Sequence, residues 1–310
     1  MSPYDLAIQN FSVAEHLLQL HQLFRDLSSY DPGTEFGAAV ITQLALPPGS
    51  ALHHAKNTRL LCGINGAIPM PSCLLVREGI DFLLRQAVLV ASSAIESYFW
   101  DTLRENALTV IKVKGRKSDS TLREITLTID DYLSLESYSD PDERLRQIIL
   151  SRFERSTIYD FNKIGEITAI LGVKEFWPEV AKEIGLTPGE LQSRLNNLIS
   201  RRNKITHRAD RPESGTKPED IDSLGLRAMS HAWADTHITT AKSFVMASDS
   251  VISKAISQLK LIIAQREEQK LAQQTLRPSD PEISTEPSQP SAMEATSETV
   301  TVVNTDSRDE

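Results

Sequence analysis

Two long segments of this sequence carry apolar residues at the three- and four-residue spacing of an α-helix, and they constrain the fold more than any other feature. They run from about residue 76 to 106 and from about 233 to 265. Each has one broad apolar face that must be buried against other helices. The same spacing recurs in shorter segments, at 3–27, 142–156, 158–171 and 177–184. We therefore predict an all-α helical bundle.

Three segments interrupt the helical pattern. Prolines and glycines break it between residues 29 and 73, which predicts a long irregular connector or a separate small element. Alternating apolar and polar residues at 109–113 and 124–129 flank a glycine turn and predict a small β-hairpin insertion. Residues 275–310 contain eight acidic and two basic residues, and so hold -6 of the net charge of -9. Since this stretch has little apolar surface to bury, we predict a disordered acidic tail.

These interruptions predict three parts: a helix with a connector at 1–75, the bundle at 76–266, and the tail at 267–310. No apolar run approaches the roughly 20 residues of a spanning helix, so we expect no membrane insertion. The N-terminus lacks the pattern of a signal peptide, and two cysteines are too few for a disulfide framework. We therefore expect a cytoplasmic protein.

A basic cluster lies between residues 194 and 211. It holds one acidic residue, Asp210, and six basic residues: Arg194, Arg201, Arg202, Lys204, Arg208 and Arg211. Such a cluster is either a solvated helix face or a surface for a polyanion, and its composition alone does not decide between them.

The spacing within the cluster is more informative. Thr187 and Glu190 have the form of a capping box, which predicts the start of a helix. The apolar stripe of that helix occupies positions 191, 195, 198 and 205, and the remaining position of the stripe holds Arg202. A buried guanidinium needs a partner. That partner is either Glu96 of the first long helix or a bound anion such as phosphate.

His207 follows Arg202 by five residues. Five residues of an ideal helix turn the chain by roughly 140°, so the two side chains cannot converge from one regular helix. Asn203 and His207, four residues apart, do share a face. Either the helix ends near Thr206, or an arginine and a histidine that act together come from different chains.

The segment from Arg202 to His207 resembles the Arg-x4-6-His motif of HEPN domains. With Arg201 before it and Arg208 to Asp210 after it, it is similar to the motif of bacterial HEPN proteins of the RiboL-PSP type. The helix around residues 89–98 resembles the first core helix of that family. The resemblance implies a bundle that forms a homodimer, in which the motifs of both protomers line one cleft. Active members are endoribonucleases without a metal or other cofactor, often toxins or antiphage effectors.

The resemblance also implies a role for each residue. Arg202 would bind the scissile phosphate, His207 would transfer protons, and Asn203 would be the polar residue beside the arginine. Glu96 matches the acidic residue of the first core helix more weakly. The other basic residues would steer the RNA backbone, namely Arg201, Lys204, Arg208 and Arg211.

Three hypotheses follow, and we favour the first. The chain is a dimeric endoribonuclease, or a catalytically inactive HEPN-like module that docks RNA or a protein partner, or a structural protein in which Arg202 only pairs with Glu96. The sequence leaves open the RNA target and whether an antitoxin or inhibitor protein binds the chain.

Overall fold

The structure is a computed structural model of the 310-residue chain. It describes residues 1–25, 27–30, 34–46, 51–55, 61–64, 79–118, 123, 126–153 and 161–275. The chain divides into two compact units, Met1–Arg266 and Glu267–Glu310. Of the second unit, the described part is the helical stretch 267–275.

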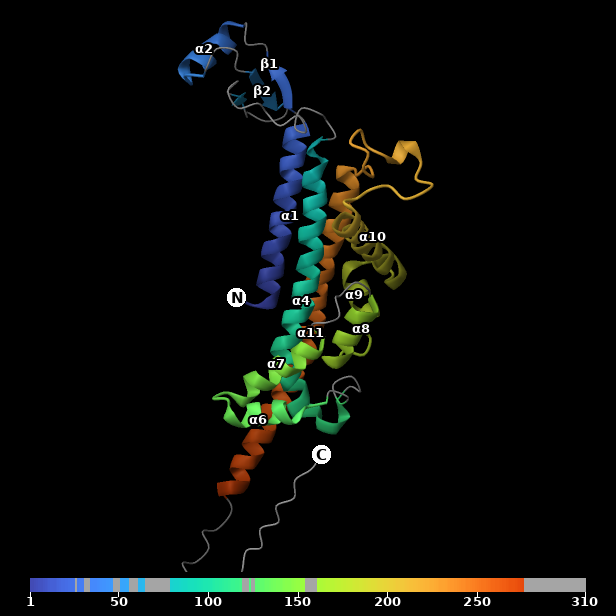
Figure 1. The fold of residues 1–310 in the computed structure, drawn as a ribbon. Helices are drawn as coiled ribbons and strands as arrows, with labels where there is room; N and C mark the ends of the chain where they lie inside the picture. Colours follow the sequence, from blue (N-terminus) through green and yellow to red (C-terminus); the bar gives the residue numbers. More distant parts are fainter. Residues whose placement is uncertain are drawn as a thin grey trace, which may run out of the picture. The chain divides into compact units, whose positions relative to one another are not determined.

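Three long helices form the framework of the first unit (Figure 1). They are α1 (Pro3–Arg25), α4 (Phe82–Lys114) and the part of α11 (His231–Thr275) that ends at Arg266. The 3-10 turn η1 (Gly79–Asp81) leads into α4. Helices α1 and α4 pack side by side. Alanines of these two helices are fully buried and permit neighbouring helices to approach closely, namely Ala7, Ala14, Ala87, Ala91 and Ala94.

Shorter helices connect α4 to α11 along the chain. They are α6 (Ile129–Ser137), α7 (Pro141–Phe153), α8 (Phe161–Ile170), α9 (Phe176–Ile184) and α10 (Pro188–Arg208). Two further 3-10 turns are η2 (Gly115–Lys117) and η3 (Pro218–Asp220). Helix α9 ends at Gly185, whose φ of 78° is easily reached by glycine alone. Helix α10 packs on α4 and α9.

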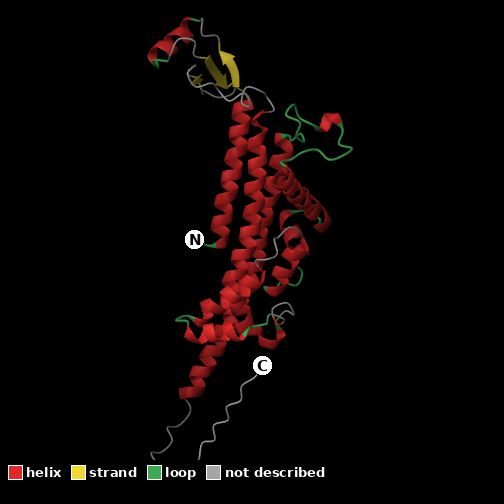
Figure 2. Cartoon of the chain, viewed as in Figure 1, coloured by secondary structure: helices red, strands yellow, loops and turns green. Residues whose placement is uncertain are grey.

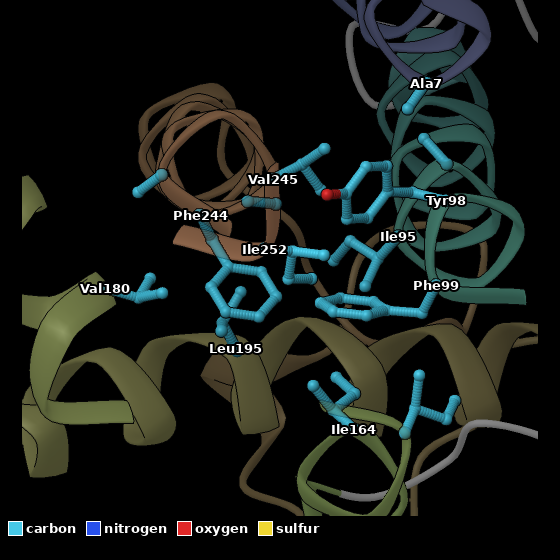
Figure 3. Packing of buried hydrophobic residues seen from close by; sticks show 14 of the residues in the cluster. Ala7, Ile95, Tyr98, Phe99, Ile164, Val180, Leu195, Phe244, Val245 and Ile252 are labelled. Atoms are coloured by element: carbon cyan, nitrogen blue, oxygen red, sulfur yellow. The ribbon is translucent and has the colours of Figure 1, made fainter. Parts of the chain in front are cut away.

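Aromatic rings fill the core between these helices (Figure 3). Phe244 of α11 lies 5.7 Å from Phe99 of α4 and 6.0 Å from Phe176 of α9, measured between ring centroids. Trp177 stacks on Phe244 at 5.6 Å. Leu195 of α10 faces the same ring cluster. The predicted all-α bundle is confirmed, and its core holds the inner face of α10.

The described part of segment 29–73 contains regular elements instead of an irregular connector. Helix α2 (Glu35–Gln43) begins after Thr34, whose hydroxyl accepts a hydrogen bond from Gly37. Three strands form an antiparallel sheet in the order β1-β2-β3 (Figure 2), at Leu27–Tyr30, Ala51–Ala55 and Leu61–Ile64. Of the two alternatives predicted for this segment, an irregular connector and a separate small element, the strands and the helix fit the small element.

The predicted β-hairpin is wrong. Residues 109–113 belong to α4, which continues to Lys114 and ends at Gly115. Leu103, Ala107 and Val110 are buried at helical spacing, so packing of this face outweighs the strand preference of β-branched residues. Of the second predicted strand, residues 124 and 125 lie outside the described residues, and α6 begins at Ile129.

The predicted division into three parts stays a prediction, and its boundary after residue 266 coincides with the end of the first compact unit. Phe11 and Leu18 of α1 belong to the same core as α4, so α1 packs as part of the bundle. Helix α11 continues to Thr275, into the segment expected to be disordered. Residues 276–310 lie outside the described residues. Among the helices that the structure describes, none is both long and apolar enough to cross a bilayer.

Candidate functional site on helix α10

Helix α10 carries the motif near its C-terminal end and begins at the predicted capping box. The Thr187 hydroxyl accepts a hydrogen bond from the Glu190 amide at 3.2 Å, and the Glu190 carboxylate accepts one from the Thr187 amide at 3.0 Å. The hydrogen bonds from Thr187 lower the pKa of Glu190 below its ordinary value. Leu191, Leu195 and Leu198 are buried, so the predicted cap and apolar stripe are confirmed.

Arg202 occupies the fourth of the five positions of this stripe, where α10 faces α4. Its Nη2 lies 3.8 Å from Oε2 of Glu96, and its Nη1 donates a hydrogen bond to Oδ1 of Asn203 at 3.1 Å. The side chains of Arg202 and Glu96 are 15% and 24% exposed. The ion pair predicted as one alternative is therefore present, but at a separation longer than a hydrogen bond and with access to solvent.

His207 lies on another face of the same helix. Because α10 stays helical to Arg208, the alternative that it ends near Thr206 is wrong, and Arg202 and His207 are not brought together within one chain. The exposed imidazole lines a hollow of about 380 Å³. Asn203 lines the same hollow, as the four-residue spacing predicts.

Two cations of the motif, the half-buried Lys204 and the exposed Arg208, share one carboxylate. Lys204 and Arg208 line the hollow, and their nitrogens lie 3.5 Å and 3.4 Å from Oε1 of Glu213. The backbone of Glu213 is held in a turn by Thr216, whose hydroxyl accepts a hydrogen bond from the Glu213 amide. Arg211 is exposed nearby in sequence. Ion pairs as exposed as these contribute about 0–1 kcal/mol.

Arg201, which was predicted to steer RNA, is held by partners within the chain. Its side chain is 12% exposed, and its Nη2 donates to Oδ2 of Asp210 at 2.7 Å and to the carbonyls of Arg227 and Ala228 at 2.7 and 3.2 Å. Burial lowers the pKa of the Arg201 guanidinium, and the neighbouring Asp210 carboxylate opposes that shift. The guanidinium is therefore held by protein partners, with little of its surface open to solvent.

Asp210, the partner of Arg201, binds a second arginine that was not predicted from the sequence. Arg85 of α4 is buried, and its Nε donates to Oδ2 of Asp210 at 2.9 Å. Its Nη2 donates to Oδ2 of Asp222 at 2.8 Å and to the Arg227 carbonyl at 3.0 Å. We call Arg85, Arg201, Asp210 and Asp222 the buried ion network. Its signal in the sequence is an arginine at helical spacing from buried Val88 and Ser92.

Within the described ranges, no group of three or more His, Cys, Asp and Glu side chains is arranged to hold a metal ion.

Comparison with known proteins gives one family match. A model described as RiboL-PSP-HEPN matches residues 68–225, just over half of the chain. The matched region contains α4, the whole of α10, Glu96, Glu213 and the buried ion network. No curated protein and no solved structure gives a match.

Proposed function

Because the chain belongs to the RiboL-PSP-HEPN family, we propose that it is a metal-independent endoribonuclease whose active site is shared by two protomers. Family membership by itself supports the broader class of RNase-type or RNA-binding proteins. The observation that carries the finer proposal is the placement of Arg202 and His207 on two faces of one regular helix, each with access to solvent.

This placement favours a shared site. Arg202 and His207 of one chain point in directions roughly 140° apart about the helix axis, so a phosphate bound by Arg202 lies away from that histidine. In a twofold dimer the same surface patch meets itself, so Arg202 of one protomer can face the histidine of the other. The solvent access of both side chains leaves them available to such a contact.

The residue types suit RNA cleavage without a metal. The 2′-oxygen attacks phosphorus as a base removes its proton, the bond to the 5′-oxygen breaks, and an acid protonates that oxygen. The products are a 2′,3′-cyclic phosphate and a free 5′-hydroxyl. Histidine serves as base or acid because its ordinary pKa of about 6.5 lies near neutral pH. A guanidinium can bind two oxygens of the charged phosphorane at once.

Glu96 has a supporting role in this proposal. A carboxylate 3.8 Å from Nη2 of Arg202 orients the guanidinium. Asn203 holds the other terminal nitrogen at 3.1 Å. An arginine oriented from two sides loses less side-chain entropy when a phosphate binds. The likeness to the family extends the proposal to a cytoplasmic toxin or antiphage effector that acts on cellular RNA as a homodimer.

The test is cleavage of a generic single-stranded RNA by the full chain in the presence of EDTA. We expect products with 2′,3′-cyclic phosphate ends. His207→Ala and Arg202→Ala should each lower the rate by about 10²–10⁴-fold, since each removes a group needed in the transition state. Circular dichroism and thermal unfolding should show that both variants fold. RNA binding without cleavage by the wild type would favour the inactive docking module instead.

Mixing protomers tests whether the site is shared. We would combine wild-type chains with the double variant Arg202→Ala, His207→Ala in equal amounts and allow subunits to exchange. If each site needs both chains, only wild-type homodimers cleave, and activity falls to about one quarter. If each chain holds its own site, about half of the activity remains, which would contradict the shared site.

A further inference from the structure

The buried ion network joins α4 to the C-terminal end of α10, which carries the motif. Asp210 has 0% exposure, and its Oδ2 accepts hydrogen bonds from Arg85 of α4 and Arg201 of α10. With Asp222, the network holds two positive and two negative side chains. Buried charges persist only where partners offset the loss of hydration, so each charge depends on the partners that it directly binds.

The backbone after α10 is bent to bring Asp210 into this place. Ala209 and Asp210 have φ values of 49° and 58°, in the left-handed region that is unfavourable for residues other than glycine. Both amides donate to the carbonyl of Lys204, that of Asp210 at 3.0 Å. Two consecutive residues in this conformation persist only if other interactions compensate for it, and the bonds of the Asp210 carboxylate are such interactions.

Two members of the network lie on either side of the motif in the sequence and bind each other. Arg201 directly precedes Arg202, and Asp210 follows His207 by three residues. Their ion pair of 2.7 Å therefore joins the two ends of the segment that carries both side chains. The ion pair between Arg85 and Asp210 connects this segment to α4, the helix that also carries Glu96.

We propose that Asp210 is a positioning residue, which holds the His207 end of α10 at a fixed place relative to Arg202 and α4. This inference rests on the proposed function in that His207 is taken as the group that transfers protons. It adds that the rate of cleavage depends on a carboxylate that touches neither RNA nor His207.

Asp222 offers a matched control. It is also a buried aspartate, and it binds the same Arg85 at 2.8 Å. Its other oxygen accepts hydrogen bonds from the amides of Leu224 and Leu226 in its own loop. Asp222 thus joins α4 to the loop before α11, whereas Asp210 joins α4 to α10. A general loss of stability should affect both positions, whereas a loss of positioning should follow Asp210 alone.

The experiment compares Asp210→Asn and Asp222→Asn in the full chain by hydrogen exchange and by cleavage. In Asp210→Asn, amides from Ile205 to Asp210 should exchange at least about 10-fold faster, whereas in Asp222→Asn they should stay within about twofold of wild type. The kcat of Asp210→Asn should fall at least about 10-fold with KM changed by less than about threefold. The kcat of Asp222→Asn should stay within about threefold of wild type. Equal effects of the two variants on exchange or on kcat would overturn the proposal.

The experiment also decides the question if the wild type is inactive or if Asp210→Asn does not fold. If the wild type does not cleave RNA, the proposed function fails, and exchange at the end of α10 still decides whether Asp210 holds it. If Asp210→Asn does not fold, Arg201→Gln takes its place, because this change removes the bond to α10 and keeps the one between Asp210 and Arg85. Unchanged exchange from Ile205 to Asp210 in Arg201→Gln would overturn the positioning role.

Discussion

Between Arg201 and Arg211, charged side chains of the same types lie in two different environments. On the inner side, Arg201 and Asp210 belong to the buried ion network. On the outer side, Lys204 and Arg208 share the exposed carboxylate of Glu213. The inner charges have lost their hydration and depend on their partners, whereas the outer charges keep water and lose little when a partner changes. A basic cluster in a sequence therefore identifies a binding surface only after the burial of each charge is known.

The strongest test of this difference is the loss of one inner charge. Arg85→Met leaves Asp210 with one cationic partner and Asp222 with backbone amides alone. We expect the free energy of unfolding to fall by about 3–5 kcal/mol, because a buried charge loses its pair. Urea unfolding at pH 7 measures this change. Arg208→Met, which removes an outer arginine, should change it by about 0.5 kcal/mol or less. Similar losses in both variants would remove the distinction between the two environments.

The outer cations should instead control how RNA binding depends on salt. Each phosphate contact that is lost lowers the slope of log K against log salt concentration by about 0.7 for a single strand. We expect this reduction in Lys204→Gln and in Arg208→Gln, measured by fluorescence anisotropy with a labelled RNA between low and physiological salt. Arg194→Gln is the control, since Arg194 lies on the same helix but near its other end. A slope equal to that of wild type in both test variants would show that these cations do not contact the backbone.

The smallest expected effect concerns Glu213. Its carboxylate lies where an RNA phosphate would meet Lys204 and Arg208. Glu213→Gln should therefore raise RNA affinity, by about two- to fivefold at low salt, with less gain at high salt because screening weakens exposed pairs. Glu219→Gln is the control, because Glu219 is an exposed acid beside Lys217 outside the hollow. Weaker RNA binding by Glu213→Gln would show that this carboxylate organises the cations instead of competing for them.

The helices and the cap of α10 follow from the sequence because their signals are local. Apolar spacing and the Thr187 to Glu190 capping box depend on residues a few positions apart, and both are confirmed. The same spacing placed Arg202 on the inner stripe, where it meets Glu96. Local patterns failed at 109–113, where burial of Val110 on α4 outweighed strand preference.

The interior of the site did not follow from the sequence because its contacts are distant along the chain. Arg85 is separated from Asp210 and Asp222 by more than a hundred residues, and no periodicity relates positions so far apart. The inward direction of Arg201 depends on this pairing, so its contacts with Asp210 and the Arg227 carbonyl could not be predicted. Ala209 and Asp210 have left-handed backbone conformations that usually occur at glycine. Since neither residue is glycine, the turn that ends α10 could not be predicted from the sequence.

The contribution of α11 to the core has a consequence for protein synthesis. Leu195 of α10 rests against a ring cluster completed by Phe244, and Phe244 emerges from the ribosome only after the whole of α10 has been translated. A nascent chain that already displays the basic segment thus lacks the support beneath it. Under the proposed function, the nascent chain would gain cleavage activity only after the part of α11 that carries Phe244 has left the ribosome.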